Sequence, residues 1–249
     1  MKRFFVLLIL ISLAGTAFVQ AQVAGGYFDK LFEMYEEERW EDCAFRADRL
    51  LNRNKYSGDP ELYLYLAMAY HQIYQDTSLN RMPEYEDAYE DALKNLVRAK
   101  RKDRYGEYFP DNNFVIKDIV ESGVPVMLEY TRKGRYSKAY AILRRLLRLS
   151  DDAGLTFYQA ALDFYNYNEN EAEDAMYTYM PKYDSIVNAS AEYTKPLLAN
   201  SMSLYFDFLV EEYEIDSARS IIVIAQKYFP KDTAIERRYN IKTDSLRYD

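Results

Sequence analysis

A stripe of aromatic, alanine and aliphatic residues at helical spacing recurs along this 249-residue chain. Its clearest copy lies in the stretch YTRKGRYSKAYAILRRLLRLS, residues 130–150. The four copies consist of Trp40, Cys43, Ala47 and Leu50; of Tyr89, Ala92, Leu96 and Ala99; of Tyr136, Ala139, Leu143 and Leu146; and of Ile215, Ala218, Ile222 and Ala225. Residues at these spacings share one helix face, and alanine lets a neighbouring helix approach closely. We therefore expect each copy to be a helix with one buried face.

A second kind of apolar helical segment precedes these copies. The stretches YLYLAMAY, residues 63–70, and FYQAALDF, residues 157–164, have the same spacing and similar residue sizes. Only eight glycines and seven prolines occur in the whole chain, which is few for a β-sandwich or barrel with frequent tight turns. The predicted fold class is all-α, with helices that come in pairs.

The paired helices resemble the tetratricopeptide repeat, a helix–turn–helix unit of about 34 residues. Tyr130, Gly134, Tyr136 and Ala139 match the turn between its two helices, and Pro230 matches its closing proline. The resemblance covers most of residues 27–240 and implies a right-handed superhelical solenoid of antiparallel helix pairs, with about four to five irregular repeats. An insertion separates Tyr70 from Tyr89, and residues 166–192 lack a clear second-helix pattern. A non-repeating helical bundle is the alternative.

The first 21 residues have the pattern of a cleavable signal peptide. Lys2 and Arg3 precede an apolar run, and Val19 and Ala21 fit the positions before a cleavage site after Ala21. A retained anchor is the alternative, but this run is shorter than the roughly 20 residues that span a bilayer. We expect residues 22–249 to form the mature helical-repeat domain, with no transmembrane segment. The predicted location is outside the inner membrane, in the periplasm or peripheral to the outer membrane.

Charge and chemistry narrow the possible functions. The formal net charge of −8 argues against nucleic acid as a partner, because such binding depends on neutralising phosphates. The single Cys43 excludes an intramolecular disulfide, and the single His71 has no third orienting group signalled in the sequence. Acidic clusters at residues 36–38, 84–91 and 169–174 could bind calcium or supply paired carboxylates, but they are typical of solvated helix faces. We expect no catalytic residues, no metal, no cofactor and no enzymatic activity.

The resemblance also implies where a partner docks. In tetratricopeptide proteins the first helix of each repeat lines a concave groove that contacts a peptide or a partner helix. Carried over by spacing, the groove residues are His71, Gln72, Arg132, Tyr158, Tyr165, Asn166, Asn200, Asp207 and Glu211. Basic residues between 98 and 148 predict a positive belt in the middle of the chain, with Arg132 beside His71 and Tyr158 as the anchor for an acidic protein segment and with little contribution from Arg148.

Four tripeptides consist of Asp, then Ser or Thr, then a small or aliphatic residue. They resemble the O-glycosylation signal of exported proteins in some Gram-negative bacteria and predict modification at Ser185, Ser217, Thr233 and Ser245. The alternative is that the aspartates of these tripeptides, or their hydroxyls, cap helices.

The function that these observations favour is a non-enzymatic protein–protein interaction scaffold or adaptor in the bacterial cell envelope. An outer-membrane assembly or secretion complex is the kind of partner we expect. The alternative is a helical-repeat protein that binds carbohydrate or peptidoglycan by stacking tyrosines on sugar rings. A helical hydrolase is a third class, for which the sequence offers no catalytic set.

Overall fold

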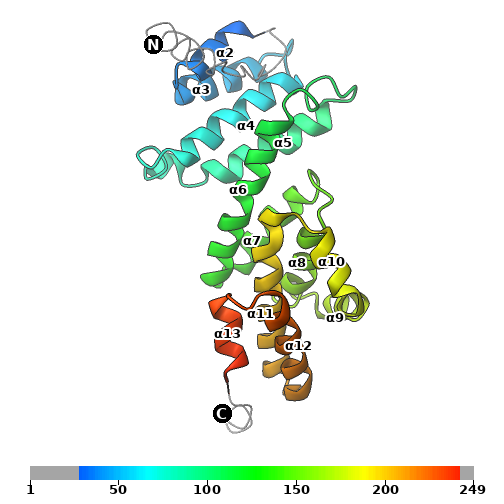
Figure 1. Ribbon diagram of the computed structural model, residues 1–249. Helices are drawn as coiled ribbons and strands as arrows, with labels where there is room; N and C mark the ends of the chain where they lie inside the picture. Colours follow the sequence, from blue (N-terminus) through cyan, green and yellow to red (C-terminus); the bar gives the residue numbers. More distant parts are fainter. Residues whose placement is uncertain (1–27, 242–249) are drawn as a thin grey trace, which may run out of the picture.

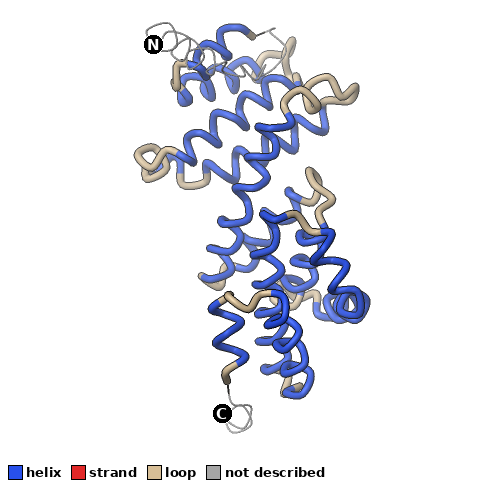
Figure 2. Tube along the Cα trace, viewed as in Figure 1, coloured by secondary structure: helices blue, strands red, loops and turns tan. Residues whose placement is uncertain are grey.

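The structure, a computed structural model, describes residues 28–241, and within that range it consists of helices and loops with no strand (Figure 2). The molecule is elongated, with helices stacked from one end to the other (Figure 1). The expected signal peptide, residues 1–21, and the predicted glycosylation site Ser245 lie outside the described residues. The all-α prediction is confirmed for the described part of the chain.

The helices follow one another along the stack. Their bounds are α2 (Asp29–Glu36), α3 (Trp40–Leu51), α4 (Pro60–Gln75), α5 (Ala88–Lys102), α6 (Asn113–Arg132), α7 (Tyr136–Leu146), α8 (Ala153–Asp163), α9 (Glu169–Tyr179), α10 (Tyr183–Ala189), α11 (Lys195–Glu211), α12 (Ile215–Tyr228) and α13 (Thr233–Tyr239). Three single 3₁₀ turns accompany them: η1 (Pro83–Tyr85), η2 (Met180–Lys182) and η3 (Glu192–Thr194). From α2 to α9 each helix packs on the next, and α11 packs on both α8 and α12.

The recurring stripe forms the helix contacts, as predicted. Ala139 and Ala218 are completely buried, and so are Ala92 and Ala47. The large residues of the stripe are buried or half-buried beside them. Since these alanines have no exposed surface, a larger side chain there would have to push neighbouring helices apart. The stripe therefore identifies the core face of α3, α5, α7 and α12.

One turn geometry links the two helices of four hairpins. Gly134, between α6 and α7, has a positive φ of 68°, and the following N–H, of Arg135, donates to the carbonyl of Tyr130 at 2.8 Å. This bond, from one residue to another five positions earlier, is characteristic of the Schellman turn. The sequence indicated this turn because glycine adopts positive φ at little cost.

The other three hairpins make the same turn without glycine. Their positive-φ residues are Glu38, Tyr167 and Tyr213. The next N–H again donates to the carbonyl five positions earlier, from Arg39 to Met34, from Asn168 to Asp163 and from Glu214 to Leu209, at 2.8 to 3.1 Å. The turn thus recurs between α2 and α3, α8 and α9, and α11 and α12.

Aspartate marks the start of three other helices. The carboxylates of Asp59, Asp152 and Asp232 accept backbone N–H bonds at the N-termini of α4, α8 and α13. Such caps satisfy amides that have no partner within the helix. The spacing of Thr233 to Glu236 also fits a capping box, but the N-cap is Asp232, because its carboxylate accepts from the amides of Ala234 and Ile235.

Helix α6 joins the two ends of the stack. It contains Pro125 and contacts α4, α5, α7 and α11 (Figure 1). Its Gly123 lies against α5 and α7, where an added Cβ would sit 2.5 Å from the Tyr89 hydroxyl and 2.8 Å from a methyl of Leu146. The close approach of these three helices therefore requires glycine at this position.

Candidate functional site

Two of the predicted groove residues are buried in the helix stack. His71 is 1 % exposed and Tyr158 is completely buried, so the expectation that they face a partner is wrong. The Tyr158 hydroxyl shares a hydrogen bond with Thr131, which ties α8 to α6. His71 lies in α4 and Tyr158 in α8, and both helices are apolar on most of their surface. Residue spacing does not show which face of such a helix is buried, because that depends on where the neighbouring helices pack.

His71 belongs to a polar cluster between α4 and α6. Its Nε2 lies 2.9 Å from Ser122 Oγ, and its Nδ1 lies 3.7 Å from Asp118 Oδ2. The three residue types are those of a nucleophilic Ser–His–Asp set. Burial lowers the pKa of the His71 imidazole against the opposing effect of Asp118, so the ring is uncharged at neutral pH and has the protonation state of a general base.

The rest of this cluster fits a structural contact better than a nucleophile. Asp118 is 57 % exposed and too far from Nδ1 for a hydrogen bond. Ser122 lies inside α6, where backbone amides donate to carbonyls one turn earlier and leave no donor for an oxyanion. The cluster joins α4 to α6.

Three other predicted groove residues make hydrogen bonds within the chain, and a fourth, Asn200, is half-buried. Gln72 donates to the Tyr35 hydroxyl of α2 at 3.0 Å. Asn166 donates to the Leu162 carbonyl at the end of α8, and the Tyr165 hydroxyl donates to the Leu204 carbonyl of α11. The Oδ1 atom of half-buried Asn200 has no hydrogen-bond partner among the described residues. Gln72, Asn166 and Tyr165 therefore make contacts within the helix stack.

The structure brings three of the predicted residues together at the C-terminal end. Asp207 and Glu211 of α11 both raise the pKa of Tyr165, whose burial is the larger cause. Asp207 is already paired with Arg238 of α13 through two hydrogen bonds. This part of the expected groove is therefore occupied by the protein's own helix α13.

Arg132 is exposed at the end of α6, as expected of a docking residue. It is not beside His71, however. Ser122, which contacts His71, is ten residues earlier in the same helix, and such a separation is about 15 Å along the helix axis. The set that sequence spacing assigned to one groove is thus dispersed over the stack.

A different surface has the character of a docking site. A groove of about 860 Å³ runs between α9 and η2 on one side and α11 and α12 on the other. We call it the acidic groove. It is lined by Glu173, Asp174, Met176, Tyr177, Met180, Pro181, Tyr205, Phe208, Leu209, Glu212, Glu214, Ser217, Ser220 and Ile221.

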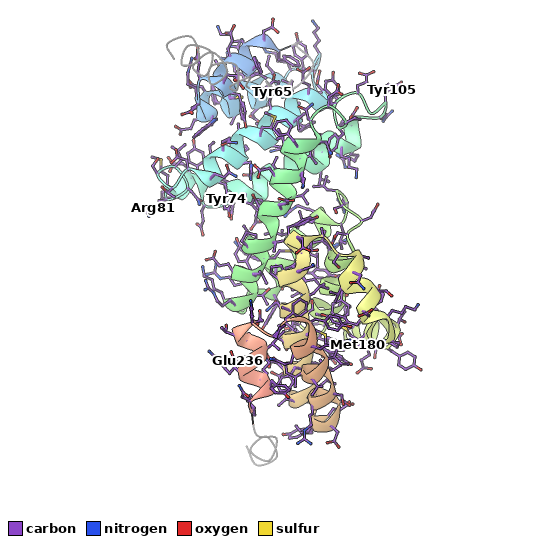
Figure 3. The ribbon with its side chains drawn as sticks, in the orientation of Figure 1. Tyr65, Tyr74, Arg81, Tyr105, Met180 and Glu236 are labelled. Atoms are coloured by element: carbon purple, nitrogen blue, oxygen red, sulfur yellow. The ribbon has the colours of Figure 1, made fainter. Side chains whose placement is uncertain are left out.

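The acidic groove combines an apolar floor with a negative rim. Met176, Phe208 and Leu209 are buried beneath it, and Met180 lies at its edge on the side of α9 (Figure 3). Four carboxylates and no basic side chain are among its lining residues. Burial is the larger cause of a raised pKa for Tyr205, and the negative charges of Glu214 and Glu173 add to it. Carboxylates from opposite sides of the groove therefore both lie close enough to affect the Tyr205 hydroxyl.

Sequence reasoning did not find the acidic groove. The cluster at residues 169–174 was its only signal, and a solvated helix face explains such a cluster equally well. The groove exists because α9 lies beside α11 and α12, whose nearest lining residues are more than twenty positions away in the chain. Helical periodicity carries no information about that adjacency.

Three of the predicted glycosylation residues are exposed: Ser185, Ser217 and Thr233. The capping alternative explains only one of the three tripeptides, because Asp232 caps α13. Asp184 instead accepts a hydrogen bond from the Tyr228 hydroxyl, and Asp216 follows the N-cap of α12 without a side-chain cap there. Ser217 lines the acidic groove.

Within residues 28–241, no cluster of His, Cys, Asp and Glu is arranged to hold a metal ion. Of the helices in the same range, none combines the length and apolarity needed to cross a bilayer. Comparison of the chain with family models, curated proteins and solved structures gives no match in any of the three.

Proposed function

We propose that this protein is a non-enzymatic interaction scaffold of the bacterial cell envelope, built as a tetratricopeptide-like solenoid, which binds a basic segment of a partner protein in the acidic groove. Two observations support the repeat. The same Schellman turn occurs in four hairpins, and completely buried alanines recur in α3, α5, α7 and α12. A stack of such units has a large surface for its core, which suits binding.

The acidic groove is the observation that carries the proposal. Its floor offers methionine, phenylalanine and leucine, and its rim offers only negative charge. Methionine side chains adapt to the shape of an incoming apolar group. A helix that presents apolar residues on one face and Lys or Arg on its edges would bury the first and pair the second. The expected partner segment is therefore basic and amphipathic.

The envelope location comes from the sequence. Residues 1–21 have the pattern of a signal peptide, and export would place the chain among envelope complexes such as those for outer-membrane assembly or secretion. The partner we expect is a protein of that compartment.

Charge reversal at the rim tests the proposal. Wild-type protein and the Glu173→Lys/Glu212→Lys variant are used to capture proteins from an envelope extract of the native host, and basic segments of the captured protein are then titrated calorimetrically. We expect affinity to fall at least about tenfold, or about 1.4 kcal/mol, and to weaken with added salt. The matched control is Glu84→Lys/Glu86→Lys, which reverses two exposed acids before α5. Equal binding by all three proteins would refute docking in the acidic groove.

A glycan ligand is the alternative function. Tyr177 at the groove edge is 85 % exposed, and an exposed ring can stack on a sugar. Titration with peptidoglycan fragments distinguishes the two functions, because a Tyr177→Ala variant would then lose binding while the charge reversal would have little effect.

A further inference from the structure

A second concave surface, opposite in charge to the acidic groove, lies between α5 and α7. Its volume is about 580 Å³. We call it the basic recess. Its lining residues are Lys94, Val97, Arg98, Lys100, Arg101, Arg145 and Arg148, so that every lining side chain except Val97 carries a positive charge.

Few of these charges are neutralised by the protein. Lys94 lies 3.4 Å from Asp91, and Arg145 lies 3.9 Å from Glu90. Within residues 28–241, the remaining four cations of the recess have no carboxylate within ion-pairing distance. Lys100 donates instead to the backbone carbonyl of Arg148 at 2.9 Å.

Arg145 has the most constrained position. Its side chain is 30 % exposed, and its buried Nη1 atom has no hydrogen-bond partner among the described residues. The separation from Glu90 is too long for a hydrogen bond. A buried guanidinium donor without an acceptor is costly, and Arg145 therefore keeps unused hydrogen-bonding capacity at the wall of the recess.

Helix dipoles explain part of the cluster. The last turns of α5 and α7 contain basic residues, and cations stabilise the negative ends of helices. That effect is confined to the last turn. Lys94 and Arg98 lie further back in α5. Lys94 pairs with Asp91, and Arg98 donates to Asn95 at 3.4 Å and lies over the Tyr63 ring, but these contacts leave the positive charge of Arg98 without a carboxylate.

An anionic ligand would balance this positive charge. A concave site lined by one sign of charge focuses the field and attracts the opposite charge, and arginines bind oxyanions in bidentate geometry. Six cations in one small recess, in a chain whose net charge is −8, match a ligand with dense negative charge. A phosphate monoester carries up to about two charges on three oxygens, whereas each carboxylate carries only one.

We propose that the basic recess binds a multiply phosphorylated ligand, either a soluble polyphosphorylated molecule or the phosphorylated headgroup of a lipid. Its volume falls in the range of small-ligand sites, about 300–1,000 Å³. Val97 is the one apolar lining residue, so the recess takes the phosphorylated group and leaves any acyl chain outside. The guanidinium groups of Arg145, half-buried Arg98 and exposed Arg148 would bind the phosphate oxygens.

Calorimetry with inorganic tripolyphosphate tests the site in the whole protein. We expect binding that weakens with salt and an affinity at least tenfold lower in Arg98→Gln/Arg148→Gln. The matched control is Arg132→Gln/Arg219→Gln, which removes the same charge from exposed positions outside the recess and is expected to bind like wild type. Absence of wild-type binding, or an equal loss in the control, would overturn the proposal.

Two further titrations identify the ligand class. Sedimentation uses phosphatidylcholine vesicles without and with phosphatidylinositol bisphosphate. The phosphates belong to a lipid headgroup if only the vesicles with the bisphosphate bind and tripolyphosphate displaces them. Tripolyphosphate binding without vesicle binding assigns the phosphates to a soluble molecule. A polyglutamate peptide that binds the recess more tightly than tripolyphosphate would contradict the proposal in favour of an acidic protein segment.

Discussion

Glu61 shows how strongly the helix stack controls single side chains. It is completely buried near the start of α4. Burial, with smaller contributions from the negative charges of Asp59 and Asp29, raises the pKa of its carboxyl to about 7, while the backbone of Phe28 opposes the shift. At neutral pH the folded protein must therefore either bind a proton there or keep a charge in an apolar site, and both reduce stability relative to a neutral side chain.

The stability of the protein should consequently depend on pH through Glu61. Between the unfolded value of about 4.5 and the folded value of about 7 the folded state binds more protons, so stability falls as pH rises through this window. Glu61→Gln should remove that loss, which leaves the variant more stable than wild type by about 1–3 kcal/mol at about pH 8 and similar at about pH 5. Urea unfolding at both pH values measures the difference in stability between the variant and wild type. His71 is present in both proteins, so its own effect on the pH dependence cancels in that difference. Parallel pH profiles for the two proteins would contradict the burial argument, and Glu84→Gln, at an exposed position, should leave the profile unchanged.

At the scale of the element, the hairpin is defined by its turn as much as by its stripe. Gly134 adopts positive φ freely, and an added Cβ there would meet no atom within 4 Å. Tyr213 adopts the same conformation with a side chain that is 85 % exposed. Three of the four turns thus tolerate a conformation that L-residues disfavour, because the bond that closes the hairpin holds them there.

Exchanges at the turns should separate backbone conformation from packing. Gly134→Ala should destabilise the protein by about 1 kcal/mol, since only the positive φ is penalised. Tyr213→Gly should cause no loss, because relief of that penalty offsets the greater freedom of glycine in the unfolded chain. Tyr177→Gly is the control, equally exposed but inside α9, and should cost about 1 kcal/mol. Similar losses at positions 177 and 213, determined by thermal or urea unfolding, would argue against the shared turn.

Over the whole molecule, charge is distributed unevenly. The basic recess lies between α5 and α7, and the acidic groove lies toward the C-terminal end between α9 and α12. The chain therefore offers two surfaces of opposite charge on one elongated stack (Figure 1). This arrangement leaves room for two ligands at once, which the proposed scaffold function requires.

The intact mass of protein from its native host tests export and modification together. We expect a chain that begins at Gln22 and carries additional mass from sugar, with Ser185 as the first site, because Asp184 does not cap a helix and a sugar on Ser217 would obstruct the acidic groove. Peptide mapping locates the addition. The mass of residues 1–249 would contradict cleavage, and the mass of bare residues 22–249 would contradict glycosylation.

The sequence by itself determined the local structure. Alanine and aromatic residues at helical spacing predicted the buried faces of α3, α5, α7 and α12, and Gly134 indicated its turn, because helical periodicity and positive φ are properties of residues close together in the chain. Tyr167 and Tyr213 make the same turn without any residue that signals it. Only the tertiary structure decided that His71 and Tyr158 are buried, since α4 and α8 are apolar on most sides and their neighbours select which side is covered. The acidic groove and the basic recess were likewise decided by tertiary structure, because each lies between helices whose separation and angle depend on the packing of side chains far apart in the chain.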